Sequence, residues 1–208
     1  MTTKLRRTSP NPHRRYKPVF RPDKFRELVL YHADRALQAD EATYDPVKLQ
    51  KLLWITDMVS YGTLGASMTG ATYIRKIRGP VASEFLPQAV VLEREKALAF
   101  QKVVRDGRTI ERAVALKPAD ILKFSQQEVQ IADQALALFG KVESPTISEW
   151  SHGLRGWRHS RIDEEIPYES IFLEDDPPPA GLIDYANQVV IENHESWEAK
   201  ASPHASSA

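Results

Sequence analysis

The chain has 208 residues, of which 42% are hydrophobic and 27% charged, and its 28 Lys and Arg residues balance its 28 Asp and Glu residues. This composition is typical of a globular protein, and no apolar stretch approaches the roughly 20 residues that cross a bilayer. The absence of cysteine excludes disulfides, iron–sulfur clusters and thiolate zinc sites. Because the N-terminus also lacks an apolar signal core, we expect a cytoplasmic protein that has no membrane partner.

Opposite charges gather at the two ends of the chain. Residues 1–22 carry seven Lys or Arg and no acid, whereas residues 161–208 carry eleven Asp or Glu. Residues 1–21 also contain three prolines and show little apolar periodicity, so we predict a disordered basic arm there. The arm is either a solvated tail or a segment that binds nucleic acid or an acidic partner.

Two helices are predicted after the arm. The first begins at Pro22 and Asp23, because proline suits the first turn and an acid there interacts favourably with the helix dipole. The second is capped by Asp45, has Pro46 in its first turn, and is expected to end at Gly62. Each helix has one apolar stripe at spacings of three and four: Phe25, Leu28, Val29, His32 and Ala36 on the first, and Leu49, Leu52, Leu53, Thr56 and Val59 on the second.

The middle of the chain contains the predicted β component. Polar and apolar residues alternate enough over 72–77 to predict a strand. We expect Arg-Gly-Pro at 78–80 to end this strand and a helix to follow over 83–100. Asp106-Gly107 lies between two β-branched runs, a pattern typical of a hairpin with a primed turn. The predicted fold class is therefore mainly α with a small antiparallel β-sheet, an α+β fold in which a strand and a hairpin are inserted into a helical domain.

Capping patterns predict further helices. Ser125 and Glu128 form the S-x-x-E pattern before an apolar face that ends at Gly140, and Thr146 and Glu149 repeat the pattern. The predicted organisation has five parts: a disordered basic arm over 1–21, a helical domain over 22–173, an acidic, proline-rich linker over 174–180, a C-terminal amphipathic helix over 181–199, and a disordered tail over 200–208.

No constellation of residues predicts catalysis, a cofactor or a metal ion. His152 and His159 are seven residues apart and do not share one helix face, so they lack the converging ligands that zinc needs. His32 lies on an apolar stripe, where a hydrogen-bonded core histidine is a better interpretation than a catalytic base. We therefore expect no enzyme, and a hydrolase centred on His32 or His152 ranks last among the hypotheses.

Aromatic and cationic residues alternate in the segment ISEWSHGLRGWRHSR, residues 147–161. Aromatic rings beside guanidinium groups suit nucleic-acid bases and phosphates, and they suit protein interfaces equally well. A third interpretation is that Trp150 and Trp157 anchor the core beneath a solvated basic face. The pattern alone leaves these three alternatives open.

Several of these motifs occur in an order that resembles a known family. The order is KLQKLLWITDMVSYG, MTGATYIRKIRGPVASEF, the hairpin, ISEWSHGLRGW and IPYESIF. Over residues 25–173 the chain resembles the Panacea domain, the SocA-like antitoxins of bacterial and phage toxin–antitoxin pairs. The family pattern is carried by Lys48, Leu49, Lys51, Leu52, Leu53, Gly79, Pro80, Val81, Ser151, His152 and Trp157. The chain departs from it at Arg78, where an aromatic residue commonly precedes Gly-Pro, and at Trp150-Ser151, which replaces Leu-Thr.

The resemblance implies a helical antitoxin that neutralises a cognate toxin, usually encoded next to it, by direct binding in a type II-like system. Two further candidate partners are operator DNA and a protease that degrades the toxin. The aromatic and Arg residues of the motifs are the predicted anchors for the partner: Trp54, Tyr61, Tyr73, Arg75, Arg78, Trp150 and Trp157. The alternative is a nucleic-acid-binding regulator that uses the basic arm and residues 150–161.

Overall fold

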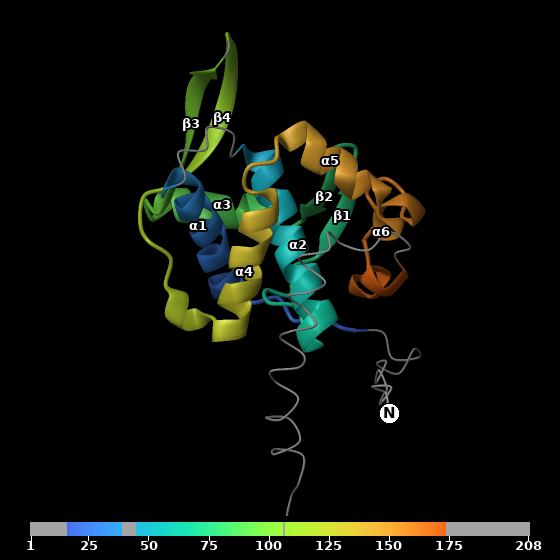
Figure 1. The fold of residues 1–208 in the computed structure, drawn as a ribbon. Coiled ribbons are helices and arrows are strands. Elements are labelled where there is room, and N and C mark those ends of the chain that lie inside the picture. The colour runs from blue at the N-terminus through green and yellow to red at the C-terminus, as the bar shows by residue number, and fades with distance from the viewer. Residues whose placement is uncertain (1–15, 39–44, 106, 174–208) are drawn as a thin grey trace, which may run out of the picture.

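A computed structural model of the chain describes residues 16–38, 45–105 and 107–173. Helices dominate it, and two antiparallel pairs of strands accompany them, so the predicted α+β class is confirmed (Figure 1). The two pairs form separate two-stranded sheets. The elements are α1 (Pro22–Gln38), α2 (Pro46–Leu64), β1 (Tyr73–Lys76), β2 (Gly79–Ala82), α3 (Phe85–Arg94), β3 (Leu98–Arg105), β4 (Arg108–Ala115), η1 (Ile121–Lys123), α4 (Gln126–Phe139), α5 (Ser144–Gly153), α6 (Arg155–His159) and η2 (Tyr168–Leu173).

Helix α2 is the centre of the fold, because α1, α4, α5, β2 and η2 all pack against it. Asp45 caps it as predicted, with the side chain accepting from the Lys48 backbone N–H at 2.8 Å. The helix continues past Gly62 to Leu64, where Gly65 adopts the left-handed conformation with φ 75° and ends it. Both predicted apolar stripes lie in the core at every position for which side-chain burial is described. Elements surround α2 so closely that most of its polar residues are buried as well: Lys48, Lys51, Thr56, Asp57 and Ser60.

A buried carboxylate joins α2 to the chain that follows it. Asp57 is fully buried, and its oxygens accept hydrogen bonds from the Thr69 backbone N–H at 2.7 Å and from the Tyr73 hydroxyl at 2.8 Å. Burial raises the pKa of the Asp57 carboxyl, and these hydrogen bonds offset part of that rise. The network fixes the start of β1 against the central helix.

Strands β1 and β2 correct the sequence-based interpretation of Arg-Gly-Pro. Lys76 pairs with Gly79, so the chain reverses at Ile77 and Arg78, and Gly79 and Pro80 begin a second strand instead of leading directly into a helix. Proline is tolerated in β2 because a two-stranded sheet consists only of edges. The joint is therefore a hairpin turn with its tip at Ile77 and Arg78.

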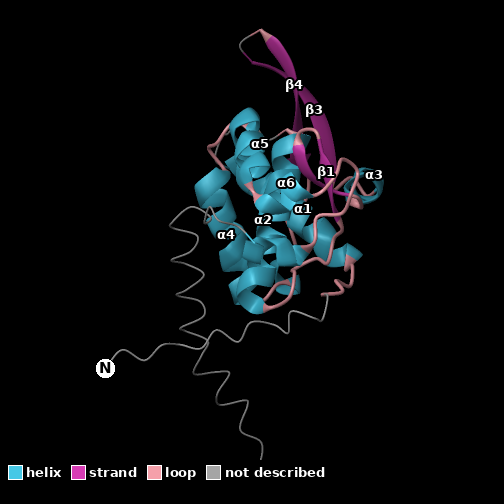
Figure 2. Ribbon diagram, turned by 90° about the vertical axis from the view of Figure 1, so that its right-hand side faces the viewer, coloured by secondary structure: helices cyan, strands magenta, loops and turns pink. Residues whose placement is uncertain are grey.

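Helix α3 is shorter than the predicted span of 83–100. It ends at Arg94, and Lys96 adopts a left-handed conformation with φ 52° that breaks the helix before β3 begins. Strands β3 and β4 form the predicted hairpin, with the register Leu98↔Ala115 to Arg105↔Arg108 and with Gly107 at φ 73° in the turn. This second hairpin projects away from the helical body in both views (Figures 1 and 2).

The predicted capping box of Ser125 and Glu128 is confirmed, with both reciprocal hydrogen bonds present. The second predicted box is wrong, because α5 begins at Ser144 and already includes Thr146. Proline in the first turn starts this helix three residues earlier, and its N-cap residue Glu143 makes no side-chain capping bond.

Residues 16–21 pack onto the body, so this part of the predicted arm is ordered. The Tyr16 ring lies 4.5 Å from that of Tyr61, and the Arg21 backbone N–H donates to the Thr69 carbonyl at 2.8 Å. The rest of the predicted arm (1–15) and the predicted linker, C-terminal helix and tail (174–208) lie outside the described residues. Among the described residues, no helix is long and apolar enough to span a membrane.

Candidate partner-binding surface

The sequence motifs that carry the family resemblance meet at the β1–β2 hairpin. Lys51 of α2 donates from Nζ to the Pro80 carbonyl at 2.8 Å. Gly79 has φ 99°, and a Cβ placed there would lie 2.4 Å from Lys51 Cε and 2.5 Å from Ser151 Oγ. Only glycine lets the strand approach α2 and α5 this closely. The Gly-Pro motif thus seats the hairpin on the two helices that carry the other motifs.

Two buried lysines of α2 support this arrangement. Lys48 and Lys51 are 0% and 1% exposed, and Lys48 donates from Nζ to the Gly140 carbonyl at the end of α4. Burial lowers the pKa of Lys51 to about 7, and the carboxylate of Asp45 offsets part of that effect. The motif residues Leu49, Leu52 and Leu53 are fully buried beside them.

A stack of three side chains locks α6 against β1. The Arg75 guanidinium carbon lies 3.9 Å from the centroid of the Trp157 ring, and the His152 ring stacks on the same indole at 4.0 Å. Trp157 Nε1 donates to the Lys76 carbonyl at 3.2 Å, and Arg75 donates to the carbonyl of Ser160. Burial, and then the cations of Lys51 and Arg75, lower the pKa of His152. These contacts make the hairpin a rigid platform.

The other edge of β1 is also occupied. The Arg75 backbone N–H donates to the Glu164 carbonyl at 2.9 Å, and the Ile166 N–H donates to the Tyr73 carbonyl at 2.8 Å. Asp163 donates from its backbone to the Arg75 carbonyl and has φ 68°. The segment after α6 thereby places Ile162 and Asp163 beside the hairpin tip.

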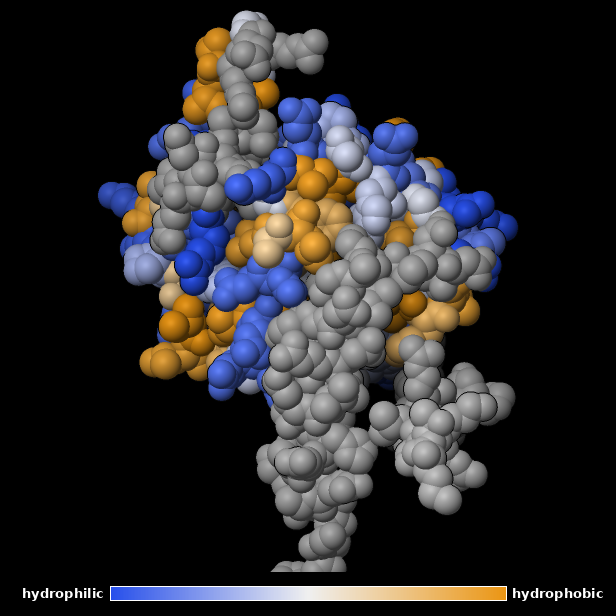
Figure 3. Space-filling view, viewed as in Figure 1, coloured by the Kyte–Doolittle hydropathy of each residue, from blue (hydrophilic) through white to orange (hydrophobic). Residues whose placement is uncertain are grey.

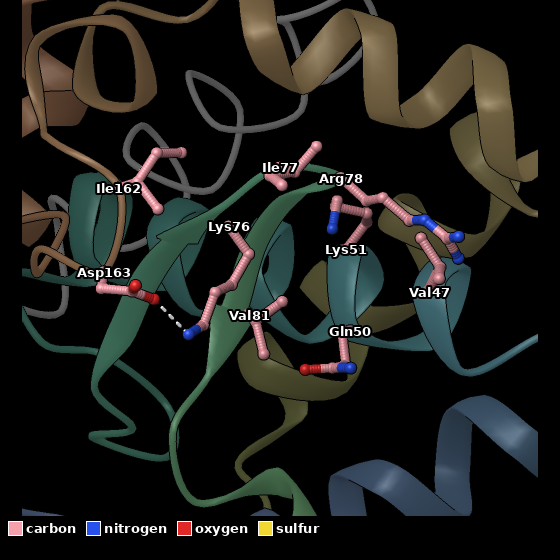
Figure 4. A pocket seen from close by; sticks show the side chains of 9 residues that line it. All are labelled: Val47, Gln50, Lys51, Lys76, Ile77, Arg78, Val81, Ile162 and Asp163. Atoms are coloured by element: carbon pink, nitrogen blue, oxygen red, sulfur yellow. Dashed lines mark hydrogen bonds and ion pairs between the residues drawn. The ribbon is translucent and has the colours of Figure 1, made fainter.

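A hollow of about 420 Å³ lies beside the turn, between β1–β2 and the first half of α2 (Figure 4). Its aliphatic walls are Val47, Ile77, Val81 and Ile162. Its polar lining consists of Gln50, Lys51, Lys76, Arg78 and Asp163. Lys76 and Asp163 form an ion pair across it. We call this region the hairpin-tip hollow.

The rim of the hollow exposes apolar groups. Ile77 is 79% exposed at the turn and Ile162 is 50% exposed opposite it. Arg78, which follows Ile77, is also exposed, and its side chain extends toward the end of the hollow where Val47 lies (Figure 4). Exposed aliphatic groups beside cations on a rigid support are what a protein-binding surface needs.

The structure places some of the predicted anchor residues in or against the core and the others at the hairpin. Trp54, Tyr61 and Tyr73 are 4%, 4% and 1% exposed, so they belong to the core instead of the surface. Trp150 is half-buried and packs on Trp54 and Phe139 at ring distances of 6.3 and 4.7 Å. The remaining three, Arg75, Arg78 and Trp157, gather at the hairpin.

Sequence reasoning missed Ile77, Ile162 and Asp163. An isoleucine between two cations in a tight turn was the available signal for Ile77, but the turn itself was interpreted as the end of a strand. Ile162 and Asp163 reach the hollow only through the backbone pairing with β1, which no local pattern indicates.

The histidines and the Trp/Arg segment also have defined places. His32 is fully buried, its Nε2 lies 3.1 Å from Thr56 Oγ1, and burial lowers its pKa to about 3, which confirms the predicted core histidine. Within the described ranges, no three His, Asp or Glu side chains come together as metal ligands. Trp150 and Trp157 are both engaged inside the fold, so residues 150–161 present the exposed side chains of Arg158, His159 and Arg161 without a free aromatic platform.

Comparison with protein families agrees with this geometry. The model of the antitoxin SocA-like, Panacea domain matches residues 49–158, which is more than half of the chain and includes most of α2, both hairpins and α5. The chain therefore belongs to the SocA-like Panacea antitoxin family, as the motifs predicted. No curated protein and no solved structure gave a significant match.

Proposed function

We propose that this protein is the antitoxin of a toxin–antitoxin pair and neutralises its cognate toxin by direct binding through the hairpin-tip hollow and its exposed rim. Ile77, Arg78 and Ile162 are the proposed contact residues. Family membership supports the antitoxin role. The single observation that supports this surface is an isoleucine 79% exposed at the tip of a hairpin whose two strands are both held to the body, through the Lys51–Pro80 hydrogen bond and the Arg75–Trp157 contact.

Rigidity matters for such a surface. A loop that orders only on binding loses conformational entropy, whereas a tip already held by the Lys51–Pro80 hydrogen bond and the Trp157 stack does not. A stable neutralising interface buries on the order of 1,600 Å² in total, so the tip would be the centre of a larger contact. Half-buried Arg75 and Trp157 would support the contact residues from beneath.

Co-expression tests the proposal. The product of the adjacent gene is expressed alone and with this chain, growth is followed, and the antitoxin is then purified through a tag. We expect the neighbour to arrest growth, the full chain to relieve the arrest, and the two proteins to purify together. Toxicity that this chain does not relieve, or relief without a complex, would contradict neutralisation by direct binding.

A further inference from the structure

The lining of the hairpin-tip hollow contains more basic than acidic side chains. Its lining contains the cations Lys51, Lys76 and Arg78 and one acid, Asp163. Asp163 is already paired with Lys76. Neither Lys51 nor Arg78 forms an ion pair with a carboxylate among the described residues, and an anion bound beside the buried amine of Lys51 would favour its charged form.

Lys51 is buried and Arg78 is exposed, but both side chains have N–H donors without an acceptor within the described ranges. The Lys51 ammonium is 1% exposed and donates to one acceptor, the Pro80 carbonyl, although an ammonium carries three donors. Arg78 is exposed and makes neither a hydrogen bond nor an ion pair within the part of the chain that the structure describes. An anion entering the hollow would meet donors from both α2 and the hairpin turn.

A third polar group also lacks a partner. Gln50 Oε1 is buried and accepts no hydrogen bond in the structure. Buried polar groups without partners are uncommon, and a backbone N–H from an incoming peptide would satisfy this one. The site thus offers donors for an anion and an acceptor for an amide.

The walls of the hollow restrict the kind of anion. Val47, Ile77, Val81 and Ile162 are aliphatic, and no aromatic ring is among the lining residues. A nucleic-acid backbone would leave these walls uncovered and find no ring on which to stack its bases. A protein segment with an acidic side chain next to an aliphatic one would match both the charge and the walls.

Resting on the proposed function, we infer that the hairpin-tip hollow binds an acidic side chain, flanked by an aliphatic residue, on an exposed segment of the toxin. Arg78 and Lys51 hold the carboxylate, and the aliphatic walls cover its neighbour. The inference specifies what the toxin presents without specifying the toxin's activity.

The first test measures the affinity of the purified toxin for the full chain and its variants. Reversing the charge in Arg78→Glu should weaken binding by about 10- to 100-fold, and Arg78→Lys by much less. Arg94→Glu reverses an exposed charge on α3 outside the hollow and serves as the control, with an expected change below about threefold. A toxin variant that changes its contacting Asp or Glu to Arg should restore binding to Arg78→Glu. Unchanged affinity in Arg78→Glu would overturn the inference while the proposed function stands.

The second test does not need the toxin. A displayed library of random peptides is selected on the full chain, and we expect enrichment of Asp or Glu beside Val, Ile or Leu, with binding lost in Arg78→Glu. If the co-expression experiment fails but these peptides are selected, the site stands without the proposed function. Peptides without acids, no selected peptides, or duplex DNA or RNA whose binding depends on Arg78 would each contradict the inference.

Discussion

Each of the two hairpins of this protein contains a glycine with positive φ at or beside its turn, but the two differ in how they contact the helices. The β1–β2 hairpin has four residues in each strand and is held by α2, α5, α6 and the segment after α6. The β3–β4 hairpin has eight residues in each strand, contacts α1, α2 and α3 near its base, and projects away from the helices (Figure 2). Figure 3 shows apolar residues on this projecting hairpin too. Exposed apolar groups alone therefore do not separate the two hairpins, whereas anchoring does.

The comparison predicts the largest difference at the glycines of the two hairpins. In Gly79→Ala the new Cβ would meet Lys51 Cε and Ser151 Oγ, and φ 99° is unfavourable for alanine, so we expect a loss of about 3 kcal/mol in the free energy of unfolding. Gly107→Ala has the strained φ of 73° but nothing within 4 Å, and should cost about 1 kcal/mol. Urea denaturation of both variants measures the difference, and equal losses would show that the first hairpin is not seated as described.

The next largest effect concerns the stack that holds α6. Trp157→Ala removes the ring on which Arg75 and His152 lie, and since Trp157 is half-buried we expect a loss of about 2 kcal/mol. Thermal unfolding followed by circular dichroism measures this. Trp157→Phe keeps a ring but loses the bond to the Lys76 carbonyl, and should lie between the wild type and Trp157→Ala.

A smaller effect concerns Lys51, the residue of α2 that holds the β1–β2 hairpin, and a pH titration measures it. The pKa of Lys51 is about 7 in the folded protein against an ordinary 10.5, so the folded chain binds fewer protons than the unfolded chain between these values. Stability contributed through Lys51 therefore rises with pH above about 7, by up to about 1.4 kcal/mol per pH unit. Urea denaturation at pH 7, 8 and 9 should show this rise relative to Lys51→Met.

The matched control lies on the other hairpin. Lys102 is exposed on β3 opposite Glu111, so Lys102→Met should follow the pH dependence of the wild type. Identical slopes for the wild type and Lys51→Met would contradict the buried, weakly basic state of Lys51.

The smallest predicted effect is on the surface of the projecting hairpin. Val104 is 76% exposed, so Val104→Thr buries no polar group and opens no cavity. We expect a change in the free energy of unfolding of less than about 0.5 kcal/mol. A loss above 1 kcal/mol in urea denaturation would mean that β3–β4 is packed against the body more closely than its exposure indicates.

Signals within a few residues predicted local structure well. Asp45 with Pro46 and Ser125 with Glu128 begin helices where expected, because the capping bond and the proline ring act within one turn. Asp106-Gly107 likewise marks a hairpin turn through the backbone freedom of glycine. The same reasoning failed at Thr146, where Pro145 already lies in the first turn of α5.

The site depended on contacts between distant segments and could be predicted only in part. Trp54, Tyr61 and Tyr73 have the chemistry of interface anchors but are buried, because elements from both halves of the chain surround α2. Gly79 and Pro80 were recognised as a turn, yet the hairpin depends on Lys51 and Ser151 meeting the backbone there. Ile162 reaches the hollow because residues 163–166 pair with β1.

The most direct test compares Ile77→Asp with Val104→Asp, because the two side chains are 79% and 76% exposed on the tips of the two hairpins. Affinity for the purified toxin is measured for both variants, with thermal unfolding as the check that each is folded. We expect a loss of at least about 10-fold for Ile77→Asp and a change below about threefold for Val104→Asp. Equal affinities, or a greater loss in Val104→Asp, would contradict the claim that the anchored hairpin binds the toxin.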